Sequence, residues 1–225
     1  MRNVERVGKP PSLENNAKKW TAELLAEIKK RRRDPKKVPG KLYEKYKRDD
    51  IREALNVMYK GLCCYCEMQI APVSFDHVEH RYPKKKYPKR TYEWDNLHLA
   101  CTQCKVSKGD EFDSKNPILD AVLDEISKHL SYRIDILGVW CEAKSSRGKT
   151  TRKHANLNRL QLRLDRVKIY LEAKEFIKIL REDPHNPKLS NARQWLEALC
   201  DGPYGSVIRW AMDRKPELRS EEDAE

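Results

Sequence analysis

No stretch of this 225-residue sequence approaches the roughly 18 consecutive apolar residues that a membrane-spanning helix needs. Its first residues, MRNVERVGKPPSLENN, also lack the apolar segment of a secretory signal peptide. Both absences argue against a membrane-embedded or exported protein. The sequence therefore predicts a cytoplasmic location and no membrane partner.

Acidic residues are few wherever the basic residues gather. The chain has 47 Lys and Arg against 35 Asp and Glu, a net charge of +12. RYPKKKYPKR (81–90) contains six basic residues and no acid, KKRRR (29–33) has five in succession, and residues 144–168 carry nine with a single acid. Such clusters gain affinity for a polyanion by releasing its counterions, so we expect a nucleic-acid partner. The alternative is that the charge serves solubility alone.

Enough apolar side chains remain to build a core, because 39% of the residues are hydrophobic and the chain has five Trp and ten Tyr. The length suits one domain with appendages or two small domains. Alternating apolar residues over 132–143 predict one or two short strands, and Asp50 is expected to cap a helix. Helical spacing predicts helices over residues 17–33, 51–60, 118–130 and 158–182, then two shorter ones, from Ser190 and around 207–212.

Two pairs of cysteines at Cys-x2-Cys spacing predict a metal site. Thiolates from two such knuckles complete a tetrahedral S4 shell around zinc, which leaves no open position, so the zinc would be structural rather than catalytic. The alternatives are a redox-active pair or buried free thiols. The expected ligands are Cys63, Cys66, Cys101 and Cys104, and the other three cysteines are interpreted as structural: Cys64, Cys141 and Cys200.

Two acid–histidine pairs lie between the knuckles, Asp76-His77 and Glu79-His80. An imidazole that titrates near neutral pH beside a carboxylate suits general-base chemistry. A histidine in a basic surface loop is, however, usually just solvated. The two pairs by themselves do not say whether either does chemistry.

The motifs around these pairs resemble those of HNH (ββα-metal) endonucleases of the zinc-bound, four-cysteine type. They run in the order Cys-x2-Cys, acid-His-x2-Pro, Asn-Leu, Cys-x2-Cys and Lys-Gly. The segments IREALNVMYKGLCCYCE, VEHRYPKKKYP, YEWDNLHLACTQCKVSKGDEF and NPILD are similar to the PtuB-type HNH proteins of Septu and retron antiphage defence systems. The resemblance covers residues 51–120 well, and HANLNRLQL (154–162) more weakly.

The resemblance implies a mainly α fold with a small ββα-metal (HNH) core that is stabilised by zinc, and with helical N- and C-terminal regions. The expected division is an N-terminal helical region (1–60), the nuclease core (61–115) and a mostly helical C-terminal region (116–225). The last region is the candidate for docking to a partner.

The proline of the HNH frame decides between the two acid–histidine pairs. Pro83 follows His80 by three residues, whereas the residue three after His77 is His80. The resemblance therefore implies that His80 is the general base, that Glu79 is a ligand of a catalytic Mg²⁺ or Mn²⁺, and that Asn96 braces the loop and orients the His80 ring.

Lysines near this pair are expected to contact nucleic-acid phosphates, with Tyr82 and Tyr87 stacking on bases. The alternative is a solvated basic face. The lysines in question are Lys84, Lys85, Lys86, Lys89, Lys105 and Lys108.

Lys105 departs from the family pattern, which usually has Asn or His there as a further ligand of the catalytic ion. An ammonium cannot coordinate a cation. A unit charge 4 Å from a divalent ion costs about 2 kcal/mol even in bulk water. We therefore expect a weakly held ion, and a lower metal requirement for Lys105→Asn.

The resemblance implies a nuclease effector that cleaves DNA or a structured RNA such as tRNA. It also implies an ABC- or AAA-type ATPase partner (PtuA-type) and, in a retron system, a reverse transcriptase with its msDNA. Two alternatives remain: a non-catalytic zinc module that binds nucleic acid, which Lys105 favours, and an adaptor for the ATPase.

Overall fold

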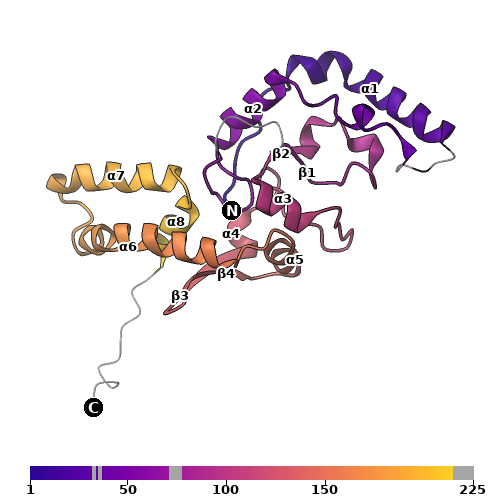
Figure 1. Cartoon of the computed structure of the whole chain (residues 1–225). Coiled ribbons are helices and arrows are strands. Elements are labelled where there is room, and N and C mark those ends of the chain that lie inside the picture. The colour runs from indigo at the N-terminus through magenta and orange to yellow at the C-terminus, as the bar shows by residue number, and fades with distance from the viewer. Residues whose placement is uncertain (32–33, 35–36, 71–77, 215–225) are drawn as a thin grey trace.

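The computed structural model describes residues 1–31, 34, 37–70 and 78–214. Within them the chain is mainly helical, with two small two-stranded sheets (Figure 1). The predicted fold class, mainly α with a small ββα core and helical terminal regions, is confirmed. None of the described helices is both long and apolar enough to cross a membrane. The helices are α1 (Pro11–Lys30), α2 (Asp49–Tyr59), α3 (Thr102–Lys108), α4 (Ile126–His129), α5 (Ser146–His154), α6 (Leu160–Glu182), α7 (Ser190–Asp201) and α8 (Gly205–Asp213).

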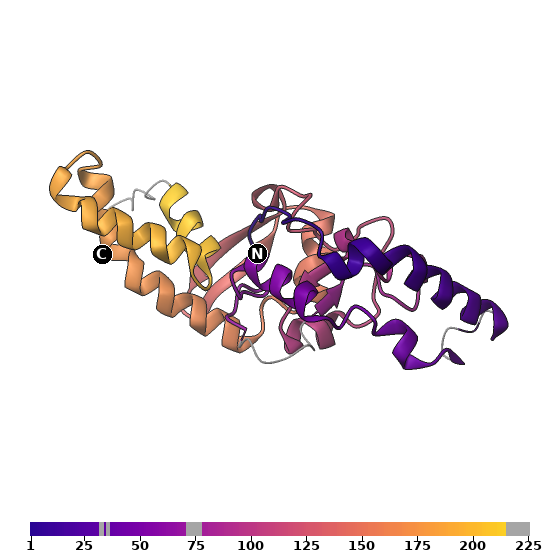
Figure 2. The same ribbon diagram turned by 90° about the horizontal axis from the view of Figure 1, so that it is seen from above.

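The molecule is elongated when seen from above, with α1 at one end and the three packed helices α6, α7 and α8 at the other (Figure 2). The short sheets and α3 lie between these two helical ends, and the N-terminus lies near the middle. The helical regions therefore flank the segment that carries the cysteines and Glu79-His80.

The first two helices pack at one side of the core. Pro11 opens α1 at a position where its missing N–H is no loss, six residues earlier than the predicted start. Asp50 does not cap its own helix; its carboxylate accepts a hydrogen bond from the Ser12 backbone N–H at 2.7 Å and so caps α1. This contact joins the N-termini of α1 and α2.

A ββα unit forms the centre of the molecule. Strands β1 (Val78–His80) and β2 (Leu97–Leu99) pair antiparallel with Glu79 opposite His98, and α3 follows β2 directly. Successive residues of a strand point to opposite faces of the sheet, so the side chains of Glu79 and His80 lie on opposite faces. Glu79 shares its face with His98, which it directly opposes. The Cys64 backbone N–H donates to the Leu99 carbonyl at 2.7 Å, which fastens the first knuckle to β2.

The helix predicted over 118–130 is wrong, because only α4 is helical there. The Asp120 carboxylate accepts from the Val122 N–H at 2.9 Å, and the Asp124 carboxylate accepts from the Asp120 N–H at 2.7 Å. Aspartate side chains that form hydrogen bonds with nearby backbone groups compete with helix formation in this way.

The strands predicted over 132–143 form the hairpin of β3 (Leu130–Asp135) and β4 (Gly138–Ala143). Helix α5 was missed, since only Gly148 and Thr151 of it are buried.

Two hydrophobic clusters hold the fold together. The larger cluster contains residues from all three regions expected from the sequence, 1–60, 61–115 and 116–225. The division of the chain into these regions stays a prediction. The smaller lies among α6, α7 and α8 and consists of Ala173, Ile177, Leu196, Cys200, Ile208 and Ala211. Helix α6 serves both clusters, because its Leu162 belongs to the larger one.

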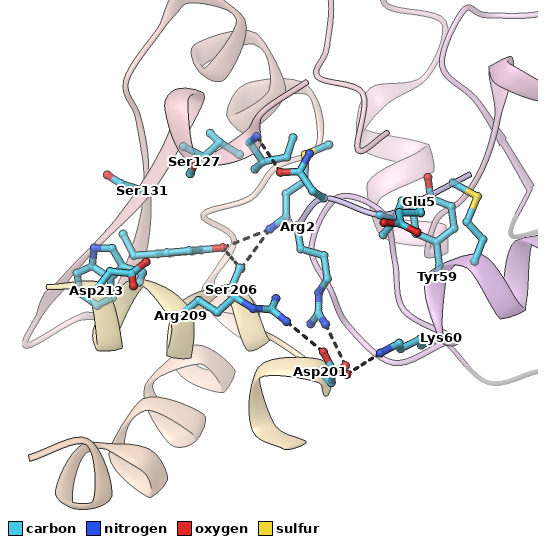
Figure 3. A pocket seen from close by; sticks show the side chains of 18 of the residues that line it. Arg2, Glu5, Tyr59, Lys60, Ser127, Ser131, Asp201, Ser206, Arg209 and Asp213 are labelled. Atoms are coloured by element: carbon cyan, nitrogen blue, oxygen red, sulfur yellow. Dashed lines mark hydrogen bonds and ion pairs between the residues drawn. The ribbon is translucent and has the colours of Figure 1, made fainter. Parts of the chain in front are cut away.

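A cleft of about 830 Å³ is lined by the N-terminal segment, α2, β3 and α8, and ion pairs join several of its lining residues (Figure 3). Asp201 lies 2.6 Å from Lys60 Nζ and 3.1 Å from Arg209 Nη2. Two lining residues of the cleft also contact the buried Glu67, which pairs with Arg2 at 2.7 Å and accepts from the Ser206 N–H at 3.1 Å. Because Glu67 follows Cys66, these bonds tie α8 to the first knuckle.

Candidate active site

The four predicted cysteines converge into one buried cluster. Their Sγ atoms all lie within 4.8 Å of one another, and those of Cys66 and Cys101 are 3.8 Å apart. A tetrahedral zinc site with Zn–S bonds of about 2.3 Å has S···S edges of about 3.8 Å, so this set fits zinc. Cys64, Cys141 and Cys200 are buried but stand outside the cluster.

Local backbone geometry aims these thiols inward. In the first knuckle the Cys63 N–H donates to the Met68 carbonyl at 3.0 Å, and Glu67 turns the chain with a left-handed φ of 62°. In the second, Cys101 is the N-cap of α3 and Cys104 lies in its first turn. The helix N-terminus carries partial positive charge, which favours thiolates there.

Arg159, just before α6, completes this centre and was missed by sequence reasoning. Its guanidinium donates to the sulfurs of Cys104 and Cys66, each at 3.5 Å. Zinc with four thiolates carries a net charge of −2, and such partners stabilise a metal site from outside its ligand shell. The only sequence signal was its place in the weakly matching HANLNRLQL segment.

His80 is buried and held in one orientation. Its Nε2 lies 3.0 Å from the Thr91 carbonyl oxygen, and the Tyr46 ring packs edge-on at 4.6 Å. Burial, with the nearby charge of Lys84, lowers the pKa of His80 to about 3, so the ring is neutral. A carbonyl only accepts hydrogen bonds, so the proton sits on Nε2 and Nδ1 carries the lone pair.

Asn96 is fully buried and braces the loop that follows β1. Its Oδ1 accepts from the Tyr82 N–H at 2.7 Å, and its Nδ2 donates to the Arg90 carbonyl at 2.8 Å. Arg90 directly precedes Thr91, whose carbonyl orients His80. These bonds are of the kind expected for Asn96, and a role in cleavage stays a proposal.

Glu79 forms a buried ion pair with Lys108. Its Oε1 lies 2.7 Å from Lys108 Nζ, which also donates to the His80 carbonyl oxygen at 2.9 Å. Burial raises the pKa of Glu79, and the Lys108 charge opposes that effect. In the described residues only the four cysteines form a group of three or more possible metal ligands. Glu79 would therefore have to leave Lys108 before it could bind a divalent ion.

The predicted phosphate-binding lysines occupy different environments. Lys108 is 1% exposed, so the expectation that it contacts nucleic acid does not match its position. Lys84 and Lys105 are half-buried, and the charge of each lysine lowers the pKa of His80. Lys84 Nζ lies 3.1 Å from the Tyr46 hydroxyl. The remaining three are exposed on the loop after β1: Lys85, Lys86 and Lys89.

The two tyrosines expected to stack on bases stack within the protein. The Tyr82 ring lies 4.4 Å from Phe112 and 3.8 Å from the Arg90 guanidinium carbon. The Tyr87 ring lies 5.1 Å from Phe112. The competing pair, Asp76 and His77, lies outside the described residues.

A second buried polar cluster, on the His98 side of the sheet, was also missed. The Tyr59 hydroxyl lies 2.6 Å from His98 Nδ1, and Asp120 approaches His98 Nε2 at 3.9 Å and Arg81 Nε at 3.8 Å. Burial, with the charges of Arg6 and Arg81, lowers the pKa of His98 well below its ordinary value. Asp120 is the aspartate of NPILD, which was its only sequence signal.

Comparison with known proteins identifies this central segment. Residues 63–111 match the family model of the HNH endonuclease. The chain is 32% identical over 161 residues to the Septu protein PtuB of Bacillus thuringiensis, covering 71% of this chain and 56% of the relative. It is 26% identical over 157 residues to the Septu protein PtuB of Bacillus mycoides (strain KBAB4), covering 56% and 53%.

The chain thus spans about half the length of the curated relatives it matches. No solved structure matches it. The predicted resemblance is confirmed: the chain contains an HNH domain and resembles the PtuB proteins of Septu systems.

Loss of one cluster cysteine should cost the protein its zinc. We expect about one zinc per purified chain, and expect Cys63→Ser or Cys101→Ser to lose it and to melt or aggregate, because the small core folds with its metal. Cys200→Ser, which changes a thiol outside the cluster, is the matched control. Metal analysis and thermal unfolding measure both, and soluble, folded wild-type protein without zinc would contradict the assignment.

Arg159→Gln should loosen the zinc without removing a ligand. Changes to groups just outside a metal's ligand shell cost roughly 10–100-fold in metal affinity, so zinc transfer to a chromogenic chelator should rise by about that factor. Arg163→Gln is the control, because its guanidinium stacks on Trp140 at 4.0 Å and touches no cysteine sulfur. Equal zinc loss from the two variants would show that Arg159 does not stabilise the cluster.

Proposed function

We propose that this chain is an endonuclease that hydrolyses phosphodiester bonds of DNA or of a structured RNA such as tRNA. In this proposal it is the nuclease effector of an antiphage complex with an ATPase. One observation carries the proposal: the histidine of the HNH motif is neutral and oriented, with the proton on Nε2 and a lone pair on Nδ1. That is the form a general base needs.

The proposed reaction begins when Nδ1 of His80 takes a proton from water, whose oxygen attacks the phosphorus. The bond from phosphorus to the leaving oxygen breaks, this oxygen takes a proton from a second water, and the hydroxide so formed recovers the proton from His80. The Thr91 carbonyl stabilises the imidazolium that results, because it accepts the Nε2 proton, and Asn96 holds this carbonyl's loop. The base starts weak because burial, with the charges of nearby lysines, depresses the pKa of His80. A bound phosphate would offset the charges of the lysines and so raise this pKa in part.

The catalytic Mg²⁺ or Mn²⁺ implied by the resemblance would polarise the phosphate and the leaving oxygen. In this proposal Glu79 would be its ligand from this chain. That requires Glu79 to part from Lys108, and no step above depends on it. The same pairing favours the second candidate function, a zinc module that binds nucleic acid without cleaving it.

The partner is proposed to dock on the outer face of α6. Leu160, Leu164 and Leu171 fall on one side of this helix and are 59%, 43% and 51% exposed. Their burial would favour association. The opposite side of α6, including Leu162, packs into the core. By analogy with the Septu relatives, the proposed occupant is a PtuA-type ATPase.

Replacing His80 should abolish cleavage. Loss of a general base lowers the rate by about 10²–10⁴-fold, so His80→Ala and the bulkier His80→Gln should both be inactive while they keep zinc and fold. His77→Ala, in the competing pair, should retain most activity. Cleavage of labelled DNA and RNA, with the ATPase present, measures this. The reverse pattern would move the active site to the first pair.

Charged substitutions on α6 should break the complex. Deletion of residues 158–225 is a poor test, because it removes Arg159 and Leu162 from the core. Instead, Leu164→Asp and Leu171→Asp should each abolish pull-down of the ATPase and leave zinc content unchanged. Ile136→Asp, at the fully exposed tip of the β3–β4 hairpin, is the control. Undiminished binding by both α6 variants would reject this docking face.

A further inference from the structure

Helix α5 carries positive charge on its exposed side and no apolar side chain there. Its sequence, SRGKTTRKH, contains four Lys and Arg, no acid, and no Phe, Tyr, Trp or aliphatic residue. Gly148 and Thr151 are its buried residues. Lys149 and Lys153 fall on the opposite side of the helix, where both are exposed, and residues four apart are neighbours on a helix surface. The two lysines therefore form one charged side.

The elements packed against α5 do not balance this charge. Among the described residues the ion pair of α5 joins Arg147 to Asp124, which leaves Lys149 and Lys153 unpaired. Helix α3 has no acidic residue. Strand β4 has one acid, Glu142, and its carboxylate already pairs with an arginine of β3 at 3.0 Å. The two exposed lysines are therefore available to an anion from outside the chain.

Buried contacts fix the direction in which this side of α5 points. The Thr151 hydroxyl oxygen accepts a hydrogen bond from the Leu119 N–H at 2.9 Å. Gly148 packs so closely on the segment before β3 that a Cβ there would clash with the His129 carbonyl oxygen. Because the buried side cannot turn away from these contacts, the lysines on the other side are held toward the solvent.

Helix α5 also adjoins α3 of the candidate active site (Figure 1). Ala155 directly follows α5, and its carbonyl oxygen lies 3.5 Å from Cys104 Sγ. One turn further along α3, a rise of about 6 Å, Lys108 donates to the His80 carbonyl oxygen. Each nucleotide adds about 3.4 Å along a duplex, so a nucleic acid that reaches the ββα unit can contact α5 at the same time.

The chemistry of this side favours phosphate groups over a protein or unpaired bases. Protein interfaces place apolar and aromatic side chains at their centres, and the exposed side of α5 offers none. Proteins that hold a single strand stack its bases on aromatic rings, and α5 has no such ring platform. A double helix hides its bases and presents rows of phosphates, which lysines bind by charge alone.

We infer that the exposed side of α5, formed by Lys149 and Lys153 with the half-buried Arg152, binds the phosphate backbone of double-helical nucleic acid. A DNA duplex and a base-paired RNA stem share this chemistry. The inference names the substrate class of the proposed nuclease and to that extent rests on it. The contact positions the duplex and reads no base sequence. It lies outside residues 63–111, which match the HNH family model.

The salt dependence of binding tests this surface. The full-length, zinc-loaded His80→Gln chain is titrated with a labelled DNA duplex, an RNA hairpin and a single strand at several salt concentrations. The double variant Lys149→Ala/Lys153→Ala should lower the slope of log affinity against log salt by about 2 for both duplexes, because each lost phosphate contact removes about 0.9. Near about 0.1 M salt, the affinity should fall by about 10–100-fold.

Lys178→Ala/Lys188→Ala is the matched control. It removes the same charge from two exposed lysines, on α6 and just before α7, that form no ion pair within the described part of the chain. Lys149→Arg/Lys153→Arg should bind duplexes like the parent chain, because arginine keeps the charge and also binds phosphate. Zinc content and thermal unfolding should be the same in all these variants, since none of the changed side chains is buried.

Cleavage with the ATPase present gives a second measure. With His80 restored, the α5 double alanine variant should lower kcat/KM for a duplex mainly by raising KM, because the phosphate contact is made equally in the ground and transition states. A fall in kcat with KM unchanged would instead place α5 in the chemical step and overturn the binding role.

The outcomes separate the surface from the nuclease function. Equal salt slopes for the α5 variant and the control would overturn the surface, even if the chain cleaves nucleic acid. A wild-type chain that binds no duplex would overturn it too, as would lost ATPase pull-down with unchanged duplex binding. A lowered slope in a chain that cleaves nothing, with the ATPase present, would keep the duplex-binding surface and reject the nuclease.

Discussion

Mutual repulsion among four buried thiolates is the constraint on which the rest of this structure depends. Sulfurs this close cannot all be charged unless a cation lies between them, and the geometry of the cluster fits zinc as that cation. Cys101 and Cys104 begin α3, and the first knuckle is fastened to β2. A zinc ion held there would therefore fix the position of α3 against the sheet, and with it Lys108, Glu79 and the His80 carbonyl.

Sequence spacing predicted the features that depend on local order along the chain. Two Cys-x2-Cys pairs indicated the cluster, and the acid-His-x2-Pro frame with its downstream Asn located the segment that folds as ββα. The helix over 118–130 failed because apolar spacing does not register aspartate side chains that capture backbone N–H groups. Helix α5 has little apolar spacing and forms by packing against β4.

Contacts between distant segments were beyond such reasoning. The acceptor for His80 is a backbone carbonyl at Thr91, and every residue has one, so no residue type announces it. Lys108 seemed equivalent to its exposed neighbours in the sequence, yet it is buried against Glu79. Arg159 reaches sulfurs that lie 55 and 93 positions earlier. Each of these pairings exists only once the ββα unit, the N-terminal helices and α6 have packed together.

Helix α6 connects the central cysteine cluster with the helical end formed by α7 and α8. Its 23 residues make a rod of about 34 Å, one end of which adjoins Arg159 at the cysteine cluster while the other packs in the small cluster with α7 and α8. Since both ends of this rod are packed, a partner bound along its outer face would bear on a helix that is continuous with Arg159. Occupation of that face and the position of the guanidinium beside the thiolates would then be linked.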